Sequence, residues 1–224
     1  GLSGLQGELP GALVIQDNPA LTSLNGLFNG LESITWLGGN ADGNALVIKD
    51  NPALTSLHGL ESIRGLGDNA DGNALVISGN AALASLEGLS GLQGHLAGAL
   101  VIQDNPALTS LNGLESITRF YFNNDGNALV ISSNAALASL EGLSGLQGEL
   151  PGALVIQDRN FMVLLSSRTI RRSRHSLNGL ESITGLWENA DGNALVISSN
   201  AALVSLEGLS GLQGELPGAL VIQD

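Results

Sequence analysis

The chain has 224 residues, of which 43% are hydrophobic, and its eight basic and 21 acidic residues give a formal net charge of −13. The apolar fraction excludes a disordered chain, and the acidic balance argues against a nucleic-acid-binding body. The absence of cysteine excludes a disulfide framework and a cysteine nucleophile. No apolar run approaches the roughly 18 residues of a membrane span. Because the chain begins at Gly1 without a signal-peptide pattern, we expect a fragment of a longer protein.

The tetrapeptide ALVI occurs eight times and defines a repeat. The intervals between successive copies are 33, 29, 25, 29, 25, 41 and 25 residues. A short unit containing GLSGLQGELPGALVI pairs with a long unit containing GLESITGLWENADGNALVI, most cleanly from Gly59 to Asn112. Such self-similarity indicates a solenoid of eight rungs, and we call a rung short or long by the unit that leads into its strand. The copies of ALVI begin at Ala12, Ala45, Ala74, Ala99, Ala128, Ala153, Ala194 and Ala219.

Within a rung, the pattern L-x-I-x-x-N is followed by a leucine at every third position. In a strand, the period of two places Leu13 and Ile15 on one side of the sheet and Ala12, Val14 and Gln16 on the other. Leucines at a spacing of three favour a tight 3₁₀-like or extended return path over an amphipathic α-helix. We therefore expect one parallel sheet of about eight short strands, with little α-helix.

Asparagine follows each strand at a fixed distance, where its side chain would satisfy backbone groups of the turn. We expect these asparagines to stack as a ladder made of Asn18, Asn51, Asn80, Asn105, Asn134 and Asn200. The DGN segments at 42–44, 71–73, 125–127 and 191–193 indicate turns before strands. They are also similar to part of a calcium loop, but the other ligand positions and the closing glutamate are absent. Weak calcium binding is the one cofactor alternative.

These rungs resemble leucine-rich repeats, and more closely the receptor L-domain-like variety with its L-x-I-x-x-N-P-x-L-x-x-L-x-G-L pattern. The resemblance covers 1–224 as a single solenoid domain and fails only at 159–175. It implies a right-handed solenoid, a location outside the cell or on its surface, and a binding role without catalysis. Both ends look uncapped, which favours self-association through them.

Candidate catalytic groups do not converge in this sequence, because the repeat places residues of the same type along a line. The histidines at 58, 95 and 175 stand at different positions of the repeat, so we interpret them as surface substitutions. The segment GLGDNA at 65–70 matches a dinucleotide fingerprint formally, but it precedes a strand instead of following one. We expect neither enzymatic activity nor a bound cofactor.

The outward face of the strands is the first candidate binding surface. Its valines and alanines form a face less polar than a solvated one, which could contact a partner, another copy or a covering segment. The alternative is that small apolar residues simply favour flat stacking. An invariant face suits a periodic partner or a structural role. The central valines are Val47, Val76, Val101 and Val130.

Aromatic residues mark the second candidate surface, where the long units differ: WLGG, GLGD, RFYF and GLWE begin at residues 36, 65, 119 and 185. We expect the second slot of each, Leu37, Leu66, Phe120 and Leu186, to point inward. The other rings take slots that are small or charged in sister units, so we expect them to be exposed and to stack on sugars or anchor a protein. Local packing of the longer loop is the alternative. These rings belong to Trp36, Tyr121, Phe122 and Trp187.

The segment RNFMVLLSSRTIRRSRH at 159–175 stands where other rungs have the five residues NPALT. It holds five of the eight basic residues, so the rest of the chain carries a net charge of −18. Its arginines, Arg168, Arg171, Arg172 and Arg174, could form a cationic finger for phosphate, an anionic glycan or a membrane surface. We favour the alternative, a passive loop or a drifted or mistranslated segment.

The sequence therefore predicts a binding or adhesion scaffold for a protein or glycan partner. The alternative function is a structural protein that assembles with like copies in a matrix or fibre.

Overall fold

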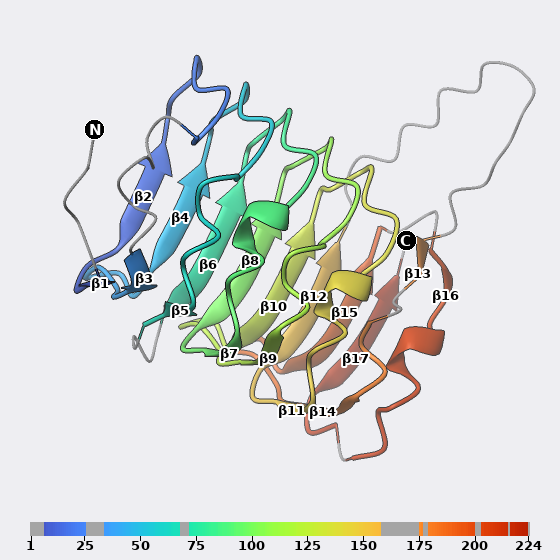
Figure 1. The fold of residues 1–224 in the computed structure, drawn as a ribbon. Coiled ribbons are helices and arrows are strands. Elements are labelled where there is room, and N and C mark those ends of the chain that lie inside the picture. Colours follow the sequence, from blue (N-terminus) through green and yellow to red (C-terminus); the bar gives the residue numbers. More distant parts are fainter. Residues whose placement is uncertain are drawn as a thin grey trace, which may run out of the picture.

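The computed structural model describes residues 7–25, 34–67, 72–157, 175–176, 179–199, 203–214 and 216–223. The rungs follow one another along one axis, and their strands form a single parallel sheet (Figure 1). This confirms the repeat-solenoid fold with one sheet of eight strands. The basic run of the insertion lies outside the described residues, and His175, which we had assigned to the insertion, belongs to a short strand.

The eight strands of the main sheet pair in the order of the rungs. Leucine pairs with leucine, valine with valine and isoleucine with isoleucine at every step. Like residues therefore form straight rows, separated by about 4.8 Å from rung to rung. The strands are β2 (Leu13–Gln16), β4 (Leu46–Lys49), β6 (Asn73–Ser78), β8 (Ala99–Gln103), β10 (Asn127–Ser132), β12 (Ala153–Gln157), β15 (Asn193–Ser198) and β17 (Ala219–Gln223).

The core lies between this sheet and the return path. Inward leucines and isoleucines of both form one continuous cluster, and most of them are fully buried. The leucine spacing of three produces 3₁₀ turns at η1 (Glu87–Leu89), η2 (Glu141–Leu143) and η3 (Glu207–Leu209). The described segments contain no α-helix, and none of their helices is long and apolar enough to cross a membrane.

Short strands line a second side of the solenoid, which the sequence pattern did not reveal. They pair the GEL or GHL segment of a short unit with the ITWL, ITRF or ITGL segment of the next long unit, and ITWL also pairs with residues 65–66 of the long unit after it. The second slots Leu37, Leu66, Phe120 and Leu186 are fully buried there, as expected. The strands are β1 (Gly7–Leu9), β3 (Ile34–Leu37), β5 (Gly65–Leu66), β7 (Gly94–Leu96), β9 (Ile117–Phe120), β11 (Gly148–Leu150) and β14 (Ile183–Leu186), with β13 (His175–Ser176) and β16 (Leu203–Ser205) paired separately.

The asparagine ladder is confirmed from Asn18 to Asn134, whereas Asn200 lies outside the described residues. From Asn51 to Asn134 each side-chain amide donates to two strand carbonyls; for Asn51 these are the oxygens of Ile15 and Lys49, both at 2.9 Å. Its Oδ1 accepts from the backbone and side-chain nitrogens of Asn18 at 3.2 and 3.0 Å. The ladder thus satisfies backbone groups of two rungs at once.

Candidate functional site

The valine row runs along the outer face of the main sheet. Val155 and Val196 pack with Val130 and Val221 in a cluster separate from the main core. Val47 and Val101 are only 8% and 9% exposed, because identical β-branched side chains in register cover one another. The row is therefore a thin apolar strip in which some valines are nearly buried, while Val76 and Val130 are partly exposed and Val14 is 44% exposed.

We expected a continuous row of alanines beside the valines, and this prediction is wrong. The register shifts in β6, where Asn73 and Leu75 pair with the consecutive residues Ala99 and Leu100, so Ala74 is an extra residue. The same bulge occurs in β10 and β15. Because of it, the alanines of the long rungs pack in the main core, and asparagine stands opposite the alanine of the next short rung. The displaced alanines are Ala74, Ala128 and Ala194, and Ala45 of β4's rung joins them in that core.

Asparagine side chains link the long rungs at the amino ends of the strands, and Asn73 donates to Oδ1 of Asn44 in the adjacent long rung at 3.2 Å. The Nδ2 of Asn123 donates to Oδ1 of Asn73 at 3.0 Å, and the Nδ2 of Asn189 donates to Oδ1 of Asn127 at 3.0 Å. Each of the last two bonds joins two long rungs across a short one, whose alanine, Ala99 or Ala153, is fully buried. A second set of asparagines therefore stabilises the face, where the sequence had indicated only turns.

The outer face of the sheet thus has three rows of side chains. These are the valine row, the amino-end row with Asn73, Ala99, Asn127 and their equivalents, and a third row at the carboxyl ends of the strands. Paired residues there alternate between serine and glutamine from Ser78 onward. Lys49 is the one charged residue among the described members of the three rows, and it lies 3.8 Å from the Asp50 carboxylate. The carboxyl-end row consists of Gln16, Lys49, Ser78, Gln103, Ser132, Gln157, Ser198 and Gln223.

The candidate aromatic residues lie exposed, but the structure does not bring them together. Trp36 is 37% exposed, Phe122 40%, Tyr121 42% and Trp187 55%. They come from the second, fifth and seventh rungs, and only Tyr121 and Phe122 are neighbours.

The ring of Trp36 and the Cβ of Phe122 also lie close to a neighbouring rung. The Trp36 indole lies against Gly65 of the next rung, and a Cβ added at Gly67 would lie 3.1 Å from its Nε1. Similarly, a Cβ added at Gly152 would lie 2.8 Å from the Cβ of Phe122. Glycine in the neighbouring rung leaves room for these side chains. Trp187 is therefore the clearest candidate contact among the four.

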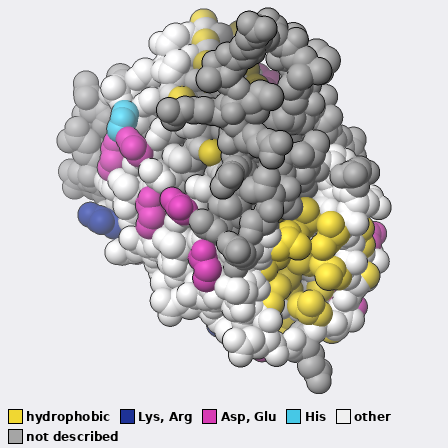
Figure 2. Space-filling view, turned by 90° about the vertical axis from the view of Figure 1, so that its right-hand side faces the viewer, with side chains coloured by type: hydrophobic (Ala, Val, Ile, Leu, Met, Phe, Trp, Pro, Cys, Tyr) yellow, Lys and Arg dark blue, Asp and Glu magenta, His cyan; other side chains and the backbone are white. Residues whose placement is uncertain are grey.

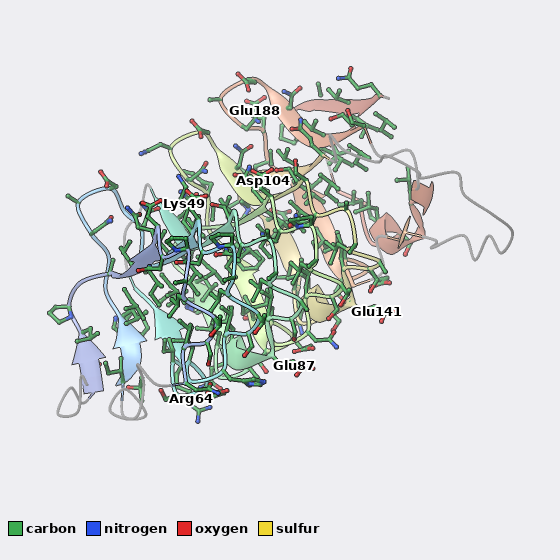
Figure 3. The ribbon with its side chains drawn as sticks, turned by 90° about the horizontal axis from the view of Figure 1, so that it is seen from above. Lys49, Arg64, Glu87, Asp104, Glu141 and Glu188 are labelled. Atoms are coloured by element: carbon green, nitrogen blue, oxygen red, sulfur yellow. The ribbon has the colours of Figure 1, made fainter. Side chains whose placement is uncertain are left out.

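Acidic side chains gather in a band on the return side (Figure 2). Glu87 and Glu141 lie on the side of the solenoid away from Lys49 and Asp104 (Figure 3). The long units carry their glutamate three positions further along than the slot of Glu87 and Glu141. Each of these side chains accepts a hydrogen bond from the N–H of the glycine two residues before it, at 2.7–2.8 Å. They belong to Glu61, Glu115 and Glu181. From the third rung to the seventh, glutamates of adjacent rungs thus occupy different slots, which keeps like charges apart.

The histidines do not form a site. His58 is exposed, and its Nδ1 lies 2.9 Å from Oε1 of Glu61. Partial burial would raise the pKa of Glu61, but hydrogen bonds from its own backbone N–H, from His58 and from Gly59 outweigh it and lower that pKa. His95 is exposed in β7 opposite Arg119. Among the described residues, no three His, Asp or Glu come together to hold a metal ion.

The end of the sheet at β17 carries an apolar patch. Leu220 and Ile222 occupy inward positions of the strand and are each 54% exposed, and Leu206 and Leu216 are exposed too. Hydrophobic side chains gather on the end of the molecule that faces the viewer in Figure 2. In the preceding strands the next rung covers the equivalent positions.

No family model, curated protein or solved structure matches the chain. The candidate surfaces are thus characterised by their own chemistry: an uncharged periodic sheet face, exposed rings, an acidic band and an apolar end.

Proposed function

We propose that the chain is a non-catalytic binding scaffold of the leucine-rich-repeat type, close to the receptor L-domain-like variety. It acts outside the cell or on its surface and presents its sheet face and its exposed aromatic residues to a protein or glycan partner. The asparagine ladder and the inward leucines support the repeat type, since these are the positions on which the resemblance rests.

The exposed tryptophan carries the proposal. The chain has only seven aromatic residues, and four of them lie more than one-third exposed. Trp187 follows β14, and its N–H is fixed by a bond to the Leu150 oxygen at 3.2 Å. A large ring held on a rigid backbone contributes contact area at little entropic cost. Sister units have glycine in this slot, at Gly38 and Gly67, so the fold does not require the ring.

Binding is tested with Trp187→Gly, which copies the sister units. We expect the unchanged chain to sediment as a monomer and to be retained on a panel of immobilised glycans and extracellular proteins. The variant should bind about ten-fold more weakly, because an aromatic anchor of this kind contributes about 1–2 kcal/mol, and its melting temperature should not change. A monomer retained by no member of the panel would contradict the proposal.

Self-assembly is the second candidate, and the apolar patch around Leu220 and Ile222 favours it. A rung of another copy could cover these side chains as the next rung does elsewhere in the sheet. Sedimentation distinguishes the two functions. A sedimenting species whose mass grows with protein concentration, and no longer does so in the Ile222→Glu variant, would support assembly over binding.

A further inference from the structure

We propose that the outer sheet face binds a linear, uncharged, β-linked glycan that runs along the solenoid axis, across the strands. In this arrangement the valine row lies under the sugar rings, and the amides of the flanking rows hydrogen-bond to the hydroxyls. The inference rests on the proposed binding function and assigns it a ligand class and a surface.

Periodicity is the first argument for a linear ligand. The register of Leu, Val and Ile is unshifted across all eight strands, so the face offers equivalent groups about every 4.8 Å. An irregular protein surface cannot match such a series, whereas each unit of an extended polysaccharide can meet an equivalent rung. Many weak contacts in series then add up along the chain.

The two-rung alternation is the second argument. Asn73, Ala99 and Asn127 alternate in the amino-end row, while Ser78, Gln103 and Ser132 alternate in the carboxyl-end row. In a flat β-linked glycan, successive sugars face opposite ways, so equivalent hydroxyls recur at every second sugar. From β6 to β17 the face repeats its polar groups with the same period of two.

Charge is the third argument. The chain carries −13 overall, yet Lys49 is the one charge among the described residues of the three rows. An anionic polymer would be repelled by the molecule as a whole, and a cationic one would find no carboxylate within the three rows, since the nearest ones, Asp50 and Asp104, follow the carboxyl-end row at its border. The face therefore complements a neutral polymer.

Available amides supply the fourth argument. Gln103 and Gln157 are half-buried in the carboxyl-end row, and their side chains have no hydrogen-bond partner within the described part of the chain. Each amide offers donors and an acceptor, which suit the mixed hydrogen bonding of sugar hydroxyls. In the strands of these two glutamines, Val101 and Val155 are each only 9% exposed, so hydrogen bonding provides most of the recognition there.

The test is isothermal titration of the full chain with neutral β-1,4-linked oligomers of glucose, xylose and N-acetylglucosamine, from two to six sugars. An α-1,4-linked glucose hexamer and a galacturonic acid hexamer are the comparison ligands. We expect affinity to rise with length for at least one neutral β-linked series and to be absent for both comparison ligands. The double variant Gln103→Ala/Gln157→Ala should bind about ten-fold more weakly, since it loses two hydrogen bonds.

The matched control is Gln93→Ala/Gln147→Ala, which removes two exposed glutamines from the return side. It should bind as the unchanged chain does, and both double variants should keep the same melting temperature.

If no neutral β-linked oligomer binds while the chain is retained on a protein, the glycan inference fails and the proposed function stands. Binding that is lost with Trp187→Gly but kept in the Gln103→Ala/Gln157→Ala variant would move the site to the aromatic edge. A dimer that this sheet-face variant dissociates, without glycan binding, would make a second copy the occupant. Both of these results overturn the inference.

Discussion

Each turn asparagine closes a strand by holding backbone groups of two rungs. The residue before it takes a left-handed conformation, with φ of 53–55° at Asp50, Asp104 and Ser133. Aspartate tolerates this region better than most residues because its short polar side chain bonds locally. The preference for Asp, Gly or Ser at this position therefore follows from the geometry that aims the asparagine inward.

Removal of one ladder side chain should be costly at the centre of the molecule. Asn105 is fully buried, its Nδ2 donates to the Ile77 and Gln103 oxygens, and its Oδ1 accepts from the backbone of Asn80. Asn105→Ala leaves these groups without partners, so we expect the free energy of unfolding to fall by about 2–4 kcal/mol. Urea denaturation followed by circular dichroism measures it.

Asn112→Ala is the control for this change, since Asn112 is exposed and its loss should cost less than about 0.5 kcal/mol. Equal effects of the two substitutions would show that the ladder does not stabilise the fold.

The two sets of asparagines differ in how well the sequence predicts them. The ladder could be predicted because its residues recur at one place after six of the eight strands. The bridges from Asn123 to Asn73 and from Asn189 to Asn127 could not, because the partners are 50 and 62 residues apart and skip a rung. Only the stacking of long units over an intervening short one brings them together.

At the scale of elements, hydrophobic periodicity predicted the strands, their parallel order and the 3₁₀ return. It did not predict the bulge that turns Ala74 inward, because a pattern of alternating residues does not reveal an extra residue in one strand. The short strands of the second side were missed because their segments hold only three or four residues. The exposure of Trp36 and Trp187 was predictable from variation between units, but whether a ring packs on a neighbour depends on glycines in another rung.

Close stacking of the return path leaves no room for a methyl group at η2. A Cβ added to Gly142 would overlap the carbonyl oxygen of Leu111 in the preceding rung. We expect Gly142→Ala to lower the free energy of unfolding by about 1–3 kcal/mol, because backbone atoms must shift. Gly11→Ala is the control, since no atom lies within 4 Å of its added Cβ. A Gly142→Ala variant as stable as the Gly11→Ala variant would mean that the rungs separate easily.

At the scale of the whole molecule, the insertion at 159–175 interrupts a series that is otherwise regular. We predict that replacing it with NPALT raises the melting temperature by about 4 °C or more, because an asparagine then continues the ladder beyond Asn134. Replacement with APALT shortens the chain by the same number of residues but does not restore that asparagine, so it should raise the melting temperature less. Differential scanning calorimetry compares the three proteins.

A fall in stability on the NPALT replacement would show that the insertion is an integrated element. Loss of partner binding at unchanged stability would instead support the cationic-finger hypothesis for its arginines.

The staggered glutamates also restrict how such a molecule can change its length. Glu87 and Glu141 share one slot, and Glu61, Glu115 and Glu181 share another. Loss of one rung from this region would bring two carboxylates of the same slot into adjacent rungs, whereas loss of a short and a long rung together would leave the pattern intact. We therefore expect the loss of a short and a long rung together to disturb this region less than the loss of one rung.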